Sequence, residues 1–187
     1  MNKGKKTYYY LLFALIMICS TFSLKAQTYT EYEVKAGYLY NFSKFIKWPE
    51  NTFESESSQF IIGIYNDEAF GKVLEKVIDG RKILDRNWTV KYCSTVKEIE
   101  GCQMLFIATV SKKEMMDLLE FTRKKPVLTV GNNIEEFCEN GGIINFTGKY
   151  IKNRFQINNE AAKRSGFYIS SKLLMLAKII TEDEIKF

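Results

Sequence analysis

The chain has 187 residues with 46% hydrophobic and 26% charged side chains, which suits one globular domain, and it has no histidine, which excludes Ser-His-Asp and Cys-His catalysis. Its formal net charge is +5, but the first 26 residues hold four lysines and no acidic residue, so the remainder carries 23 basic and 22 acidic side chains. This near neutrality provides no electrostatic drive toward nucleic acid, and we expect no nucleic-acid partner.

The N-terminus predicts a secretory signal peptide over residues 1–26. Three lysines precede an uncharged, largely apolar run over residues 8–24, and Ala26 is a small residue at the cleavage point. We expect cleavage after Ala26, which would leave residues 27–187 as a single periplasmic domain. The alternative is an uncleaved anchor helix, because the apolar run is only slightly shorter than the ~20 residues that span a bilayer.

The first half of the expected domain alternates helix and strand. Apolar residues at helical spacing predict helices, and uninterrupted or alternating apolar runs of strand length predict strands. Pro49 should end the first helix, whereas Asn66-Asp67 should cap the second and Gly80 should end it. The expected elements are a helix over 31–48, a strand over 60–65, a helix from 68 to Gly80, a strand over 88–93, a helical turn over 97–100 and a strand over 104–108.

The second half begins with the same alternation and ends differently. Two strands around Gly148-Lys149-Tyr150 predict an antiparallel hairpin, after which Asn158 should cap a helix that Gly166 ends. Ser170 or Ser171 should cap a final helix with Leu173, Leu176 and Ile180 facing inward. The other expected elements are a helix over 111–124, a strand over 127–130, a short helix over 134–139, strands over 143–147 and 154–157, and a helix over 159–165.

This order predicts the fold class. Strands buried on both faces and separated by helical segments indicate βαβ units with a mainly parallel sheet. We therefore expect an α/β fold, a three-layer Rossmann-like sandwich with an antiparallel hairpin at one edge of the sheet. A free sheet edge or an exposed cysteine would allow a homodimer.

The sequence offers no catalytic constellation. It has neither a Walker loop nor a G-x-G-x-x-G motif, and the adjacent Glu135 and Glu136 would diverge in a short helix. We expect neither an enzyme nor a bound cofactor or metal. The carboxyl ends of parallel strands nevertheless form a crevice that could hold a small polar ligand, unless these residues only cap the following helices. The candidate residues are Asn66, Asp67, Thr109, Ser111 and Asn132.

Three cysteines remain after the expected cleavage, which leaves at least one thiol without an intrachain partner. An exported compartment permits disulfides. Cys93 should end one strand and Cys102 should begin the next, which in a parallel pair places them at opposite edges of the sheet. We therefore expect no bridge between Cys93 and Cys102, because a disulfide tolerates only about 7 Å between Cα atoms.

Four segments together resemble the YfiR family of periplasmic proteins, over about residues 31–180. In this order and spacing the segments are fairly specific, although each alone consists largely of core residues and turns. They are VKAGYLYNFSKFIKWP (34–49), CQMLFI (102–107), FCENGGIINF (137–146) and RFQINNEAAKRSGFYISSKLLMLA (154–177).

The resemblance implies a function. The best-known members repress an inner-membrane diguanylate cyclase by binding its periplasmic sensory domain, and so control cyclic di-GMP and biofilm formation. For this chain it implies a sensor or cyclase as membrane partner, and we place the partner-binding surface at Arg154, Gln156, Lys163 and Tyr168. The alternative is a periplasmic small-ligand receptor that uses the strand-end crevice.

The resemblance carries over unevenly at Cys138. Some family members carry a second cysteine shortly after the double glycine and form a disulfide there, but the corresponding position in this chain is Asn145. That bridge cannot form with this alignment. Cys138 is therefore a candidate redox-active free thiol, or alternatively a small buried hydrophobic residue.

Overall fold

The structure, a computed structural model, describes residues 29–148 and 155–186, and residues 31–187 form one compact unit. The expected signal peptide and its cleavage point lie outside the described residues. So do Lys149 and Tyr150, two of the three residues expected between the hairpin strands.

Seven strands form the central sheet, in the order β3-β2-β4-β5-β6-β7-β9. Every neighbouring pair is parallel except β6 and β7, which form the expected antiparallel pair. This confirms the predicted α/β sandwich. The antiparallel pair is followed by one more strand at this edge of the sheet, because the two-residue β9 pairs with β7. The strands are β2 (Phe60–Tyr65), β3 (Trp88–Cys93), β4 (Met104–Ile107), β5 (Leu128–Asn132), β6 (Ile144–Phe146), β7 (Phe155–Ile157) and β9 (Lys178–Ile179).

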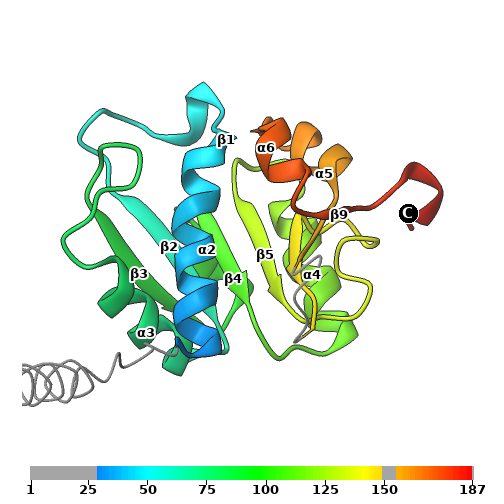
Figure 1. Ribbon diagram of the computed structural model, residues 1–187, viewed down its shortest axis with the longest axis horizontal. Helices are drawn as coiled ribbons and strands as arrows, with labels where there is room; N and C mark the ends of the chain where they lie inside the picture. Colours follow the sequence, from blue (N-terminus) through cyan, green and yellow to red (C-terminus); the bar gives the residue numbers. More distant parts are fainter. Residues whose placement is uncertain (1–28, 149–154, 187) are drawn as a thin grey trace, which may run out of the picture. The chain divides into compact units, whose positions relative to one another are not determined.

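Helices cover both faces of the sheet, as Figure 1 shows for α2 in front of the central strands and α4 behind them. The side chains of β2 explain this, because even-numbered residues enter one core cluster and odd-numbered residues enter the other. The helices are α2 (Glu31–Phe45), α3 (Glu68–Ile78), α4 (Lys112–Thr122), α5 (Asn159–Arg164) and α6 (Ser171–Leu174), with short 3-10 turns η1 (Glu50–Thr52), η2 (Val96–Ile99) and η3 (Glu182–Glu184).

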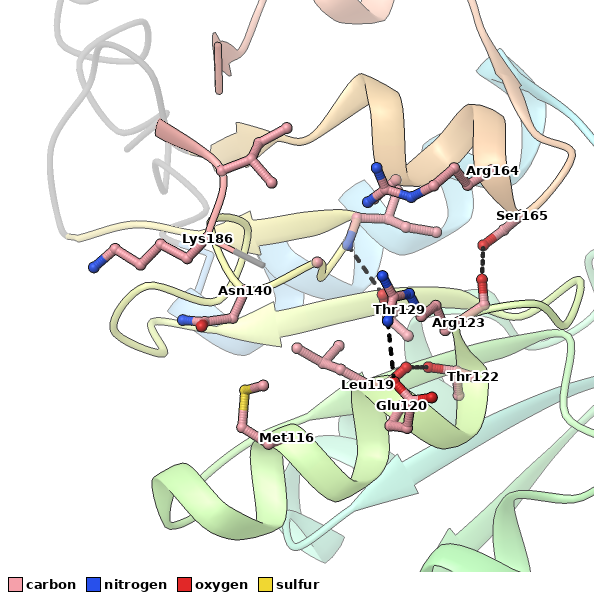
Figure 2. A pocket seen from close by; sticks show the side chains of 14 residues that line it. Met116, Leu119, Glu120, Thr122, Arg123, Thr129, Asn140, Arg164, Ser165 and Lys186 are labelled. Atoms are coloured by element: carbon pink, nitrogen blue, oxygen red, sulfur yellow. Dashed lines mark hydrogen bonds and ion pairs between the residues drawn. The ribbon is translucent and has the colours of Figure 1, made fainter. Parts of the chain in front are cut away.

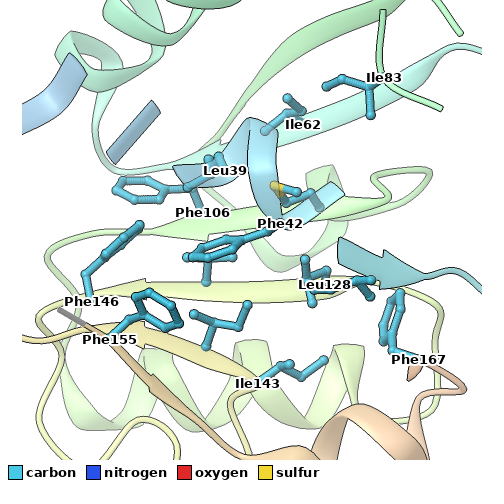
Figure 3. Close-up of a cluster of buried hydrophobic side chains, with 14 of the residues drawn as sticks. Leu39, Phe42, Ile62, Ile83, Phe106, Leu128, Ile143, Phe146, Phe155 and Phe167 are labelled. Carbon is cyan, nitrogen blue, oxygen red and sulfur yellow. The ribbon is translucent and has the colours of Figure 1, made fainter. Parts of the chain in front are cut away.

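Aromatic rings dominate the core beneath α2 (Figure 3). Phe42 is fully buried and lies 5.3 Å from the ring of Phe155 and 5.9 Å from that of Phe146. Phe70 of α3 stacks on Phe106 of β4 with ring centroids 3.9 Å apart. Large rings at several strand positions therefore fix α2 and α3 against this face of the sheet.

A second, two-stranded sheet was not expected from the sequence. The first helix ends at Phe45, and Ile46–Lys47 form β1 instead of a last helical turn. This strand pairs antiparallel with β8 (Tyr168–Ile169), with Ile46 opposite Ile169 and Lys47 opposite Tyr168. The pairing joins the end of α2 to the segment between α5 and α6.

Two other local predictions were wrong. No helix forms over residues 134–139; residues 135–140 form consecutive turns, and Glu136 has a φ of 52°, which is incompatible with a right-handed helix. The final helix is only the four residues of α6, so Leu176 lies beyond it and is 62% exposed instead of facing inward. Leu173 and Ile180 are buried as expected.

Candidate functional site

The residues predicted for partner binding lie near the carboxy-terminal part of the domain, but the structure does not gather them into one site. Arg154 lies outside the described residues. Gln156 is partly buried in β7, opposite Lys178 of β9, and Lys163 on α5 pairs with Glu160 at 2.7 Å. Tyr168 is the most prominent of the four, because its side chain is 69% exposed.

Tyr168 belongs to a group of exposed large hydrophobic residues that we call the C-terminal apolar group. Two members lie at the end of α2 and in β8, which the β1–β8 pairing brings together, and the other three follow α6 in the chain, the last of them in β9. The group consists of Phe45, Tyr168, Met175, Leu176 and Ile179.

The register of the small sheet brings two members of this group to one face. The Ser170 N–H donates to the Phe45 carbonyl at 2.9 Å, so Phe45 lies opposite Ser170 just beyond the β1–β8 pairs. Side chains two residues apart on a strand share a face, so Phe45 and Tyr168 point to the same side, while Ile46 and Ile169 point into the core. Sequence reasoning missed Phe45 and Met175, because apolar residues at helical spacing usually indicate core positions.

The five residues predicted for the strand-end crevice all take part in hydrogen bonds within the domain. Asp67 accepts from the Phe70 N–H at 3.0 Å, and Ser111 forms a capping box with Glu114 at the start of α4. The Asn66 side chain donates to the Thr109 carbonyl at 3.3 Å.

Two side chains of α2 reach the same strand ends. The Tyr32 hydroxyl donates to Asp67 Oδ2 at 3.0 Å, and Lys35 Nζ donates to Asn132 Oδ1 at 2.6 Å. Burial, followed by the hydrogen bond to Asp67, raises the pKa of Tyr32 above its usual value, so the phenol stays protonated and keeps donating. These contacts engage the polar residues as helix caps, as a link between two strand ends and as links from α2 to the strand ends, without a ligand.

Several hollows are lined by residues that the structure describes, and three of them bear on the predicted sites. One of about 350 Å³ lies at the ends of β2 and β3 and includes Asn66 and Asp67. Another of about 360 Å³ lies after β4 and β5 and includes Ser111. Both volumes reach the lower end of the range for small-molecule sites, about 300–1,000 Å³.

The third hollow lies between α4, α5 and the C-terminal segment (Figure 2). Its volume is about 90 Å³, too small for a metabolite. Arg123 at its rim pairs with Glu120, and the Ser165 hydroxyl donates to the Arg123 carbonyl at 3.3 Å, which ties α5 to the end of α4. The geometry fits a packing gap between two helices.

Cys138 is a free thiol with no exposed surface. Its sulfur donates to the Ile143 carbonyl at 3.8 Å, and burial raises the pKa of the thiol well above its ordinary value. The Asn145 amide is also buried and bonds to the backbone of Ile134. This environment favours the reading of Cys138 as a small core residue, and its redox role stays a prediction.

Cys93 and Cys102 are free thiols, in line with the expected absence of a bridge, but β3 and β4 do not form the parallel pair on which that expectation was based. β2 lies between the two strands, and both thiols are buried in the cluster on one face of the sheet. Gly63 of β2 explains where the Cys102 side chain lies, because a Cβ atom at Gly63 would be 3.0 Å from Cys102 Sγ. Cys93 is paired with Tyr65, two residues further along the same strand.

The described ranges, 29–148 and 155–186, contain no helix with the length and apolar character that crossing a bilayer requires. Within the same ranges, no three cysteine or acidic side chains gather as a metal site would need.

Comparison with known proteins identifies the family. No curated protein matches the chain. A protein-family model described as YfiR/HmsC-like matches residues 32–178, which cover nearly all of the compact unit, including both sheets and the C-terminal apolar group except Ile179. The chain therefore belongs to the YfiR/HmsC-like family.

Proposed function

We propose that the domain is a periplasmic regulatory protein that binds the extracytoplasmic sensory domain of an inner-membrane signalling protein and holds it inactive. By the family resemblance, that partner is a diguanylate cyclase, and the output is the cellular level of cyclic di-GMP. The observation that carries this proposal is the family match over residues 32–178. The predicted signal peptide supports it, because it would deliver the domain to the same compartment as the sensory domain.

We assign the C-terminal apolar group as the docking surface. Met175 and Tyr168 are 77% and 69% exposed, which leaves large apolar side chains in water in β8 and just after α6. Grouped exposed hydrophobic residues commonly mark protein interaction sites, and aromatic and methionine side chains are enriched in them. The proposed partner covers this surface, with Lys47 and Lys172 as charged residues near its rim.

The regulation needs no chemistry at this surface. A protein that binds one of two receptor conformations more tightly shifts the receptor toward that conformation. A difference of about 1–3 kcal/mol in binding free energy changes the population ratio roughly 5- to 150-fold. Burial of two or three exposed apolar side chains can supply a difference of this size.

The experiment is capture of the partner with a matched pair of variants. The tagged protein, expressed as the full chain in its own cells, is crosslinked, purified and analysed by mass spectrometry, and cellular cyclic di-GMP is measured in parallel. Met175→Asp should lose the crosslinked membrane protein and raise cyclic di-GMP. Met116→Asp is the control, because Met116 is also an exposed methionine, 42% exposed, but lies on α4.

Retention of the same membrane protein by Met175→Asp and Tyr168→Ala would refute the assigned surface. Recovery of no membrane protein with the unaltered chain, under several growth conditions, would refute the proposed function itself. The alternative small-ligand receptor predicts instead a bound metabolite in native mass spectrometry of the purified protein. The specific observation in its favour is the pair of hollows at the strand ends, although the residues around them already bond within the domain.

A further inference from the structure

Cys93 and Cys102 lie at the two ends of a short segment that folds back beneath the sheet. Cys93 is the last residue of β3, η2 follows, and Cys102 lies two residues before the start of β4. Both side chains are buried, with 4% and 3% exposure, in the same hydrophobic cluster. The backbone of this segment is fixed by the capping box of Thr95 and Glu98 and by a 3.0 Å bond from the Cys102 N–H to the Ile99 carbonyl.

The neighbouring strand leaves room for the two sulfurs to meet. Gly63 of β2 faces this cluster, and a Cβ atom at that position would lie only 3.0 Å from Cys102 Sγ. The absence of a side chain at Gly63 therefore allows the Cys102 sulfur to lie against β2, on the face to which Cys93, paired with Tyr65 of the same strand, also contributes its side chain. A disulfide requires the sulfurs to approach to about 2 Å, which rotation of the two side chains can achieve from neighbouring positions on one face.

The two thiols differ in access and in acidity. Cys93 lines the hollow of about 350 Å³ at the ends of β2 and β3, whereas Cys102 does not. The neighbouring Cys102 thiol lowers the pKa of the Cys93 thiol, with a smaller contribution from Lys91, whereas the Cys93 thiol and burial raise the pKa of Cys102. A thiolate is the attacking species in disulfide exchange, so Cys93 is suited to react first.

We propose that Cys93 and Cys102 form a reversible disulfide by exchange with a disulfide oxidant that enters through this hollow. The Cys93 thiolate attacks one sulfur of the oxidant, whose S–S bond breaks and releases one thiolate. The Cys102 sulfur then attacks Cys93, forming the internal S–S bond and releasing the second thiolate. The two cysteines lose two electrons and two protons, and the oxidant is reduced to two thiols.

The test uses protein purified after expression of the full chain and oxidised glutathione as the oxidant. Free thiols are alkylated in denaturant, and the protein is digested with trypsin without reduction. Because Lys97 lies between the two cysteines, the disulfide would join two separate peptides, 92–97 and 98–112. We expect this linked pair to replace both alkylated peptides in the folded protein, and a reductant to restore them, while Cys138 stays alkylated.

Cysteine variants separate this pair from the other possible bridges. Cys138→Ser is the matched control and should form the same linked peptides. Cys102→Ser should stop at a mixed disulfide between Cys93 and glutathione, and Cys93→Ser should react several-fold more slowly at Cys102. Persistence of alkylated Cys93 and Cys102 in the unaltered protein, or a bridge to Cys138, would overturn the proposal, and faster reaction of Cys102 in Cys93→Ser would overturn the assigned order.

Discussion

Asn158 provides the sharpest test of whether the polar residues after β7 are structural. Its side chain is fully buried and makes two bonds: Oδ1 accepts from the Ala161 N–H at 2.8 Å, and Nδ2 donates to the Cys138 carbonyl at 2.7 Å. The first bond caps α5, and the second ties α5 to the turns before β6. We predict that Asn158→Ala destabilises the domain without the involvement of any ligand.

The magnitude follows from the two bonds. Loss of a helix cap costs about 1 kcal/mol and leaves the buried Ala161 N–H without this partner. Loss of the second bond costs about 1 kcal/mol and not more, because the Cys138 carbonyl also accepts from the Gly141 N–H at 3.1 Å. Asn158→Ala should therefore lower the free energy of unfolding by about 2 kcal/mol, and Asn158→Ser, whose hydroxyl can still cap α5, by about 1 kcal/mol.

Urea denaturation measures this directly, because a lower midpoint at an unchanged slope reports a loss of stability. Asn51→Ala, at an exposed asparagine, is the control and should change stability by less than about 0.5 kcal/mol. If Asn158→Ala were as stable as the unaltered protein, the structural account would be refuted. If Asn158→Ser were as destabilised as Asn158→Ala, the separation into a cap and a second bond would be wrong.

Three further predictions concern the core, the cysteine pair and the response to acid. Phe42→Ala should lose about 3–5 kcal/mol of stability in the same assay, because it removes a fully buried ring. Phe45→Ala on the same helix should lose far less, because Phe45 is 41% exposed. Equal losses in the two variants would contradict the packing described for α2. Gly63→Ala should cost about 1–3 kcal/mol and slow the formation of the proposed disulfide, because the new methyl group would lie 3.0 Å from Cys102 Sγ; an unchanged rate would contradict the role given to this glycine. The side-chain and backbone bonds from Ser111 lower the pKa of Glu114, so its stabilisation is present above the unfolded pKa of about 4.3 and is lost as pH falls through the lower folded pKa. Glu114→Gln should therefore be less stable than the unaltered protein at neutral pH and equally stable at strongly acidic pH, as thermal unfolding across this range would show.

The predictions that depend on local sequence were largely confirmed. The run at 60–65 matches β2, and Asp67, Ser111, Asn158 and Ser170 each cap the helix that follows. Caps and strand periodicity depend on residues close together in the chain, so the sequence contains the necessary information. The candidate ligand residues were found in the same way, which is why their hydrogen bonds proved to be those of helix ends and of the first turn of α2.

The sequence patterns did not predict the pairing of strands that are far apart in the chain. β1 and β8 have two residues each and pair across more than a hundred residues, so neither has a recognisable period. Without knowledge of that pairing, the helical spacing of Phe45 indicates a core position in a longer helix. The pattern then does not predict that Phe45 lies beside Tyr168. The same limit applies to the cysteines, because the sequence patterns do not predict that the Cys102 side chain lies against Gly63 of β2, on the same face as Cys93.

The sequence by itself determined the alternation of helix and strand, the two-sided burial of the sheet and the family, because these depend on periodicity, caps and segment order. Only the tertiary structure decided which strand lies beside which, the position of Phe45 beside β8, and the burial of Cys93 and Cys102 in one cluster. The physical reason is that strand order and register are set by packing of the whole core, in which the absence of a side chain at Gly63 leaves room for Cys102 against β2.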